Sequence, residues 1–325
     1  MNIIMIMGGP SFEANVSYKS AENIGRELVN AKHNVLVCDL LKEGLTKYEE
    51  VDWEKYSIEI LPDKKFINSI ENRHVMLENL KKISISDYDI VFNATHGTFG
   101  EDGHLSGLMD MLKIKYTGSN QVSSSMAMCK DVAKMLFFYK GINTPNWLAF
   151  ERGDAGEITT TILKKMPLPL VIKPNTQGST IGLSIVKEKD KLQEAIELAF
   201  QYDTKILVES FVKGRELTVG VLGNEVLPVL EIIAPEKNYD YEAKYVFPDL
   251  PEYIVEKLKD YSLKAHEVLG ITSYSRIDYI YCEEVQDVFC LEVNTLPGMT
   301  GHSLFPKAAK KAGYSLIDIY EKIKI

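Results

Sequence analysis

The chain has 325 residues, of which 45% are hydrophobic and 26% are charged, and its formal net charge at pH 7 is −9. This length predicts two or three subdomains. The acidic balance argues against nucleic acid as a partner, because such binding relies on clustered Lys and Arg. It is compatible with nucleotide binding, since a few basic residues in a cleft are enough.

The sequence shows no sign of a secretion signal, a membrane span or a disulfide framework. The apolar start at 3–7 is too short for a signal peptide, lacks a basic lead and runs into Gly8-Gly9-Pro10. No apolar stretch approaches the length of a membrane span. The four cysteines show no CxxC spacing, which is typical of a reducing compartment. We therefore expect a cytoplasmic protein that does not associate with membranes.

Strands and helices alternate in the first third of the sequence. Hydrophobic periodicity predicts strands at 3–7, 35–39 and 89–93 and a helix at 15–30. The segment 48–82 is harder to interpret, and a helix is expected in its second half. The strand at 89–93 leads into a polar, Gly-rich loop. Such loops are typical of open α/β sheets that bind ligands above the carboxyl ends of their strands.

A boundary is expected near Thr117-Gly118-Ser119-Asn120, and the rest of the chain again mixes the two element types. The predicted helices lie at 124–140, from 192 and at 252–269. The predicted strands lie at 168–173, 183–186, 205–209, 216–222, 276–282 and 288–294.

The last two predicted strands bring the strongest chemical signal together. Side chains alternate along a strand, so Arg276 and Asp278 share one face, as do Glu292 and Asn294. A hairpin turn between the strands would place all four side chains in one patch. Carboxylate and amide oxygens are the ligands that Mg²⁺ prefers. The alternative is a solvated sheet face with ordinary ion pairs.

A second signal follows the strand that ends at Lys173. The loop from Pro174 to Gly182 is rich in Gly, Ser and Thr, and with the lysine it offers an ammonium and backbone N–H groups to phosphates. It is not a P-loop, since it lacks the GKS/T pattern and leads into another strand. It predicts a flap over a nucleotide. A plain surface hairpin is the alternative.

Two further segments suggest ligand contacts. The segment Glu209-Ser210-Phe211-Val212 ends a predicted strand and could present backbone groups to an adenine edge, with Glu216 reaching a ribose hydroxyl. The segment from Tyr239 to Tyr245 is charged and aromatic and predicts a closing lid. The alternatives are a connector with an isolated carboxylate and a solvated surface loop.

These segments, in this order, resemble the ATP-grasp superfamily, and within it the D-alanine–D-alanine ligase family. The resemblance extends from end to end and its joint spacing is specific. The motifs are Gly8-Gly9-Pro10-Ser11-Phe12-Glu13, His96-Gly97 with Gly100-Glu101-Asp102-Gly103, Lys173-Pro174 with Gly178-Ser179, Tyr241-Glu242-Ala243-Lys244-Tyr245, and Glu292-Val293-Asn294-Thr295-Leu296-Pro297-Gly298 with Ser303-Leu304.

The resemblance implies an α/β protein with an ATP-grasp fold. An N-terminal, Rossmann-like α/β substrate domain would span 1–118, a central lid domain 119–210, and a C-terminal metal-binding domain 211–325. It also implies ATP and Mg²⁺ or Mn²⁺ as cofactors, with two ions per site. D-alanine would be the amino-acid substrate, the product would serve peptidoglycan synthesis, and the protein would form a homodimer.

The resemblance also assigns roles to individual positions. Those expected at ATP are Lys130, Lys173, Ser179, Glu209, Phe211, Val212, Glu216 and Lys244, and those at the metal are Asp278, Glu292 and Asn294. Those expected at the two D-alanines are Glu13, His96, Lys244, Arg276, Ser303 and Leu304. The catalytic set would be Glu13, Ser179, Tyr245, Arg276 and the N–H of Gly298.

Three departures from the family pattern concern these roles. Cys129 stands where the family usually has Asp, and Thr180 where it often has Ser. The segment after Tyr245 is short and runs almost directly into a helix. It borders the expected second-substrate site, so other nucleophiles remain open, among them D-serine, D-lactate or another amino acid. Tyr245 favours an amine as the nucleophile. An inactive nucleotide-binding regulator is a further alternative, disfavoured because all the charged site residues are present.

Overall fold

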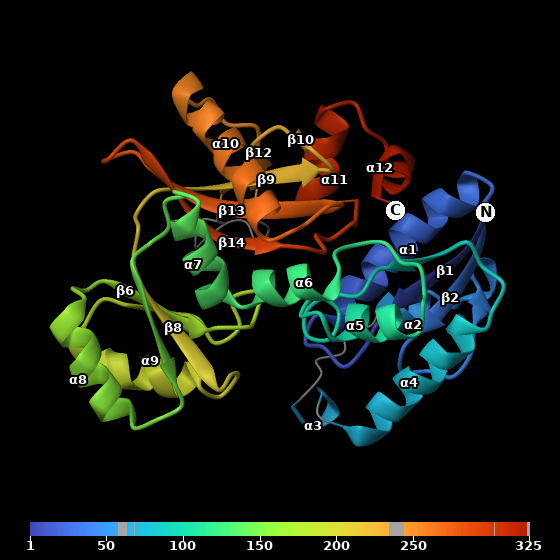
Figure 1. Cartoon of the computed structure of the whole chain (residues 1–325), viewed down its shortest axis with the longest axis horizontal. Coiled ribbons are helices and arrows are strands. Elements are labelled where there is room, and N and C mark those ends of the chain that lie inside the picture. The colour runs from blue at the N-terminus through green and yellow to red at the C-terminus, as the bar shows by residue number, and fades with distance from the viewer. Residues whose placement is uncertain (58–63, 68, 234–243, 302, 324–325) are drawn as a thin grey trace.

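The computed structural model describes residues 1–57, 64–67, 69–233, 244–301 and 303–323. Its strands form three sheets, one in each third of the chain. In Figure 1 the N-terminal sheet lies on the right, the central sheet at the lower left, and the C-terminal sheet above them. The predicted mixed α/β class is confirmed.

The N-terminal sheet is mainly parallel and is covered by helices on both faces. Alternate residues of its central strand pack against α1 on one face and against α4 and α5 on the other. The strand order is β3-β2-β1-β4, and only β3 is antiparallel. The strands are β1 (Asn2–Met7), β2 (Asn34–Asp39), β3 (Thr46–Lys47) and β4 (Ile90–Asn93), and the helices are α1 (Ala14–Asn30), η1 (Tyr48–Glu50), α2 (Glu54–Ser57), α3 (Lys64–Ile67), α4 (Ile70–Ser84) and α5 (His104–Met111).

The helix predicted at 124–140 is two helices, α6 (Gln121–Met128) and α7 (Lys130–Tyr139). The backbone at Cys129 has ψ of 89°, outside the helical region. Asn175, from the loop of the central sheet, explains the break. Its carbonyl accepts a bond of 3.1 Å from the N–H of Lys130, and its Oδ1 accepts one of 2.9 Å from the N–H of Asp131. A distant side chain thus caps α7 and fixes its first residue.

The central sheet is antiparallel, with strand order β5-β8-β6-β7 and an apolar core of its own. Two helices pack on it, at the lower left of Figure 1. The sequence did not predict β5 or α8. The elements are β5 (Trp147–Glu151), α8 (Ala155–Lys165), β6 (Leu170–Pro174), β7 (Ser184–Val186), η2 (Lys189–Lys191), α9 (Leu192–Ala199) and β8 (Lys205–Ser210).

The C-terminal sheet has the order β12-β11-β9-β13-β14, with β10 paired to β9. Helices α10, α6 and α7 share one apolar core with it, while α11 and α12 share a second core with the N-terminal sheet and α1. The elements are β9 (Arg215–Leu222), β10 (Glu225–Val226), β11 (Leu230–Ile233), β12 (Lys244–Val246), α10 (Glu252–Val268), β13 (Tyr274–Cys282), β14 (Asp287–Asn294), α11 (Leu304–Lys311) and α12 (Leu316–Ile323).

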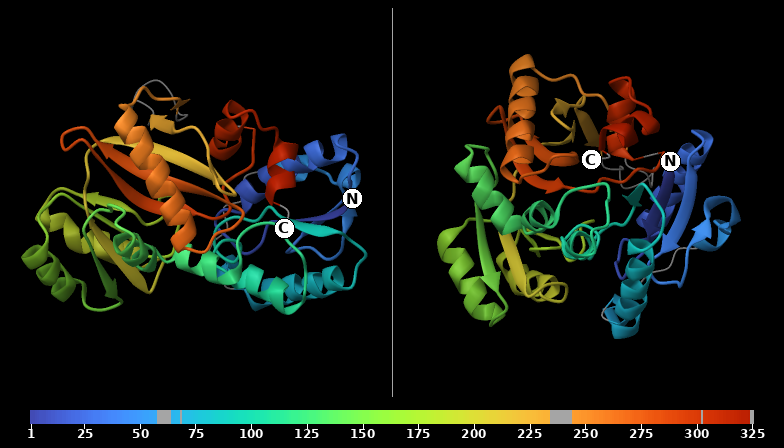
Figure 2. Two further views of the ribbon diagram at one scale, coloured as in Figure 1. Left: turned by 45° about the horizontal axis from the view of Figure 1, so that its top comes forward. Right: turned by 45° about the vertical axis from the view of Figure 1, so that its right-hand side comes forward.

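The end of the chain therefore returns to its beginning. The hydroxyl of Tyr320 in α12 lies 3.9 Å from the sulfur of Met1, and the C-terminal helices, in red, lie beside α1, in blue, in both views of Figure 2. No helix within the described ranges is both long enough and apolar enough to span a membrane. We propose the three-part division at 118 and 210 because each part contains one sheet, although α6 and α7 pack with the C-terminal one.

Asn175→Ala should destabilise the protein more than the loss of an ordinary helix cap. Asp154 is the N-cap of α8 and accepts a bond of 2.9 Å from Glu157, so Asp154→Ala should cost about 1 kcal/mol. Asn175 also donates a hydrogen bond of 2.8 Å to Asp131. Asn175→Ala therefore leaves buried polar groups unpaired and should lower the free energy of unfolding by about 2 kcal/mol. Urea unfolding of the two variants measures the difference. Equal losses would show that Asn175 is only a cap.

Candidate active site

Two cavities meet between the central and C-terminal sheets. The Lys173 cavity, of about 420 Å³, lies between the loop after β6 and the C-terminal sheet. The Glu13 cavity, of about 390 Å³, reaches the N-terminal sheet. Seven residues line both cavities and so mark the place where they join: Lys130, Gly178, Ser179, Thr180, Glu216, Asp278 and Glu292.

Strands β13 and β14 form a hairpin with the expected pairing. Arg276 lies directly opposite Asn294, and Asp278 lies opposite Glu292, immediately before an irregularity in the ladder. The Arg276 guanidinium donates two bonds, of 3.0 and 2.7 Å, to the Asp278 carboxylate. Thr218 on β9 donates a third, of 2.6 Å. The Asp278 carboxylate is therefore fixed in orientation at the junction of the cavities.

Glu292 is paired with a cation from α7. Nζ of Lys130 lies 3.2 Å from its carboxylate and donates 2.7 Å to the carbonyl of Gln177 in the flap. Burial raises the pKa of Glu292, but Lys130 and Lys173 outweigh that effect and lower the pKa to about 2. Glu292 is thus ionised at neutral pH. Close by, burial and the charge of Asp278 raise the pKa of Glu216.

Lys173 lines the cavity that the hairpin carboxylates also line, but its ion-pair partner is Glu209. The two groups lie 2.8 Å apart, and Lys134 lies 2.8 Å from the other oxygen of Glu209. The sequence analysis missed Lys134. It lies four residues after Lys130 on α7, beside the buried Ala133 and Phe137, and that position was the available signal.

Part of the lining of the Lys173 cavity is apolar. Phe211 and Val212, both expected at a nucleotide, line it together with side chains that the sequence analysis did not single out: Val171, Ile185, Ile280 and Leu291. A cavity lined by both apolar side chains and lysines suits a flat heterocycle that carries a charged tail.

Glu13 lies at the start of α1 and accepts a hydrogen bond from the hydroxyl of Ser179 in the flap. Burial and the neighbouring Glu101 raise the pKa of Glu13, and the Ser179 bond opposes them. Gly97, at φ +70°, is required beside it, because an added Cβ would lie 2.6 Å from Oε2 of Glu13. Ser179 and Glu13, expected to act together, are in contact.

His96 is buried in the wall of the Glu13 cavity. Its Nε2 lies 3.0 Å from the hydroxyl of Ser20, and its Nδ1 lies 3.4 Å from the carboxylate of Glu101. Glu101 belongs to a sequence motif to which no role was assigned, and no sequence pattern pointed to Ser20. These two contacts hold the imidazole in place.

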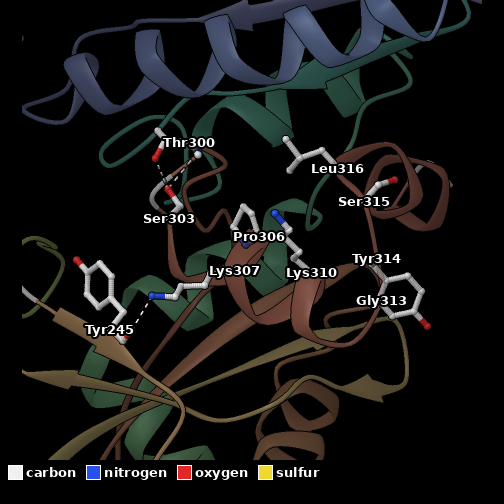
Figure 3. Close-up of a pocket in the computed structure, with 11 residues that line it drawn as sticks. Tyr245, Thr300, Ser303, Pro306, Lys307, Lys310, Gly313, Tyr314, Ser315 and Leu316 are labelled. Carbon is white, nitrogen blue, oxygen red and sulfur yellow. Dashed lines mark hydrogen bonds between the residues drawn. The ribbon is translucent and has the colours of Figure 1, made fainter.

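The Glu13 cavity is also lined by Gly298, Ser303, Leu304 and Tyr245. Within the described ranges, no hydrogen bond joins the Tyr245 hydroxyl to Glu13 or Ser179. The side chain of Lys244, and most of the expected lid at 239–245, lie outside the described residues. Tyr245 and Ser303 also border a larger cavity of about 1250 Å³, in which Lys307 donates 2.6 Å to the carbonyl of Tyr245 (Figure 3).

The metal-ligand set is divided between the two strands of the hairpin. In the described part of the chain, no three His, Cys, Asp or Glu side chains form a metal cluster by themselves. Asp278, Glu292 and Asn294 all line the Glu13 cavity, and Oδ1 of Asn294 accepts 2.9 Å from the N–H of Leu296, which orients the amide. These oxygens fit Mg²⁺, whose shell phosphates and water would complete.

Glu13→Gln should raise the thermal stability of the protein at pH 7.5. The folded-state pKa of Glu13 is raised, so the ionised carboxylate destabilises the fold above the ordinary value of 4.5. The gain should shrink as the pH falls through the raised pKa towards 4.5. Calorimetry at both pH values tests this, with the exposed Glu284→Gln as control. A Glu13→Gln variant less stable than the parent at pH 7.5 would contradict the pKa direction.

Comparisons with known proteins agree with this geometry. Residues 2–119 match the protein family described as D-ala D-ala ligase N-terminus, and residues 136–324 match the one described as D-ala D-ala ligase C-terminus. The D-alanine–D-alanine ligase of Carboxydothermus hydrogenoformans is 37% identical over 99% of this chain and 97% of that protein. That of Aquifex aeolicus is 36% identical over 96% of both.

Solved structures give the same result and confirm the predicted ATP-grasp fold. The D-alanine–D-alanine ligase from Bacillus anthracis complexed with ATP has a TM-score of 0.79 at 29% identity, covering 99% of this chain and 96% of that one. The VanG D-Ala:D-Ser ligase from Enterococcus faecalis has a TM-score of 0.81 at 28% identity, covering 99% and 98%. This chain belongs to the D-alanine–D-alanine ligase family.

Proposed function

We propose that this protein uses ATP to join two D-alanine molecules into D-alanyl-D-alanine through a D-alanyl phosphate, for peptidoglycan synthesis. The observation that supports this most directly is the junction of the two cavities at Lys130, Asp278 and Glu292. A nucleotide in the Lys173 cavity would end with its phosphates at that junction. An amino acid in the Glu13 cavity would present its carboxylate to the same point.

In the first step, a carboxylate oxygen of the first D-alanine attacks the γ-phosphorus of ATP, and ADP leaves. Phosphoryl transfer needs alignment and neutralisation of charge more than covalent help. Lys130, Lys173 and the flap N–H groups would hold the phosphates, and the apolar lining with Phe211 and Val212 would hold the adenine. Mg²⁺ or Mn²⁺ bound by Asp278, Glu292 and Asn294 would neutralise phosphate charge.

Glu13 and His96 would orient the first D-alanine. The Glu13 carboxylate would accept hydrogen bonds from the substrate ammonium. These bonds would replace part of the hydration that burial removes from Glu13. His96, held by Ser20 and Glu101, would lie near the substrate carboxylate. Ser179 ties the flap to Glu13, so binding at this point and closure of the flap would be coupled.

In the second step, the amine of the second D-alanine attacks the acyl carbon and phosphate leaves, while the amine gives up a proton. Arg276 uses two of its five N–H groups on Asp278, so three remain for the oxyanion, together with the N–H of Gly298. Ser303 and the N–H of Leu304, at the first turn of α11, would bind the second carboxylate.

The second substrate could differ within the same mechanism. The structural likeness to a D-Ala:D-Ser ligase and the large cavity beside Ser303 both favour testing other nucleophiles. An inactive regulator is less well supported, because the charged residues that phosphoryl transfer needs all line the two cavities.

We also propose a cytoplasmic location and a homodimer. The four unpaired cysteines suit a reducing compartment. The family resemblance, not a described contact, is the basis for the dimer, and sedimentation analysis of the purified chain would test it.

Incubation of the protein with ATP, Mg²⁺ and D-alanine should release one phosphate for each D-alanyl-D-alanine formed. Mass spectrometry identifies the product, and competition with D-serine and D-lactate identifies the preferred nucleophile. Phosphate release that does not depend on D-alanine would support the regulator. If D-alanine joined to D-serine or to D-lactate were the main product in competition, that compound would be the second substrate.

Glu292→Gln should lower kcat by about two orders of magnitude or more, because a metal-binding charge next to the transferred phosphate is lost. Glu284→Gln, at the exposed turn of the same hairpin, should behave like the parent. Removal of the metal with a chelator should stop turnover, and Mg²⁺ or Mn²⁺ should restore it. Near-normal turnover of Glu292→Gln at saturating Mg²⁺ would rule out the assigned cluster.

A further inference from the structure

Lys134 is a fully buried lysine next to the Lys173 cavity, and it has no role in the two reaction steps proposed above. Its side chain is 0% exposed. Glu209 and Lys173 line the cavity, whereas Lys134 lies against Glu209 without lining it. A buried ammonium is unfavourable unless it is compensated, so this position needs an explanation.

The ammonium of Lys134 is held from several sides. Nζ lies 2.8 Å from Oε1 of Glu209 and donates 2.5 Å to the hydroxyl of Thr144. Thr144 in turn donates 2.8 Å to the carbonyl of Cys290 on β14. Nζ also lies 5.8 Å from the ring centroid of Trp147. These contacts tie the lysine to both the central and the C-terminal sheet, so its position is fixed.

Glu209 is shared between two lysines. Lys173 lies 2.8 Å from Oε2, and Lys134 the same distance from Oε1. Oε1 is buried and accepts no aligned hydrogen bond within the described part of the chain, so Lys134 compensates it by charge. With both lysines protonated, the group of two ammoniums and one carboxylate has one positive charge in excess, and burial and Lys173 lower the pKa of Lys134 while Glu209 opposes them. That excess charge is available to an anion in the cavity.

Lys134 lies one helical turn after Lys130 on α7, so the two side chains leave the same face of the helix. Each of the two lysines is matched to its own carboxylate, Lys130 to Glu292 and Lys134 to Glu209. The carboxylates therefore account for the positions of both lysines.

We propose that Lys134 is a positioning residue that allows Lys173 to exchange Glu209 for the nucleotide phosphates. This inference rests on the proposed function, in which Lys173 binds phosphate. When Lys173 turns away, Glu209 keeps one counter-ion, Lys134, and does not become an unpaired buried carboxylate. Without Lys134, Glu209 would retain Lys173, and the phosphates would lose a cation.

The test compares nucleotide binding and turnover in Lys134→Met with the parent. In the variant, Glu209 would keep Lys173, and the nucleotide phosphates would lose their charge-assisted contact with this lysine. The Kd for ADP with Mg²⁺ and the KM for ATP should therefore rise about tenfold or more. The KM for D-alanine should stay unchanged. Lys140→Met is the matched control, since Lys140 follows the same helix but pairs with Glu267 at 3.4 Å on the surface. It should match the parent.

Glu209→Gln separates positioning from structural damage. If Lys134 acts only through Glu209, then Glu209→Gln and the double variant Glu209→Gln/Lys134→Met should bind ADP equally well. This pair remains informative if Lys134→Met alone fails to fold, because the double variant buries no unpaired charge. A further loss of affinity in the double variant would overturn the inference.

Failure of this inference can be told apart from failure of the proposed function. A parent protein that binds ADP, with Lys134→Met binding it equally well, would overturn only the role of Lys134. A parent protein that binds neither ADP nor ATP would overturn the proposed function, whatever the variants do.

Discussion

The site depends on pairing each carboxylate with one or two cations, which come from the same strand, from the same sheet or from α7. Asp278 is bound by Arg276, Glu292 by Lys130, and Glu209 by Lys134 and Lys173. Removing the compensation of Asp278 or Glu209, which are both buried, leaves a buried charge unpaired and costs about 3–5 kcal/mol. The cations are supplied by α7, β6 and β13. The placement of α7 between the central and C-terminal sheets is therefore part of the site, because Glu209 and Glu292 each receive a cation from this helix.

Much of the fold follows from hydrophobic periodicity. The parallel strands β1, β2 and β4 are short apolar runs, and β13 and β14 pair as a hairpin with one shift of register after Asp278. The break at Cys129 could not be predicted, because nothing local ends the helix. Asn175, far away in the sequence, captures the N–H groups of the next turn. Strand β5 escaped notice because it is short and only partly buried, so its side chains show no clear period.

The candidate site was predictable where strand geometry fixes which side chains share a face. Arg276 and Asp278 on β13, and Glu292 and Asn294 on β14, needed only the hairpin to meet. Ion-pair partners were not predictable in this way. Glu209 was expected at an adenine, and the structure places it between two lysines, one of them unnoticed. Which cation meets which carboxylate depends on how α7 packs between the sheets, and a single sequence does not record that packing.

The flap over the junction is held in a conformation that it would not adopt alone. Ser179 and Thr180 have φ of +49° and +58°, a left-handed region that costs non-glycine residues about 1–2 kcal/mol each. The central sheet has its own apolar core, and the flap bonds to other parts of the described chain through polar groups, at Glu13, Lys130 and Asp131. Polar contacts can be exchanged for contacts with a ligand, whereas a shared apolar core cannot. The flap is thus suited to open for substrates and to close over an acyl phosphate, which water would otherwise hydrolyse. Glu13 therefore has two tasks, binding the flap and binding the first substrate, and its raised pKa reflects the burial that both tasks require.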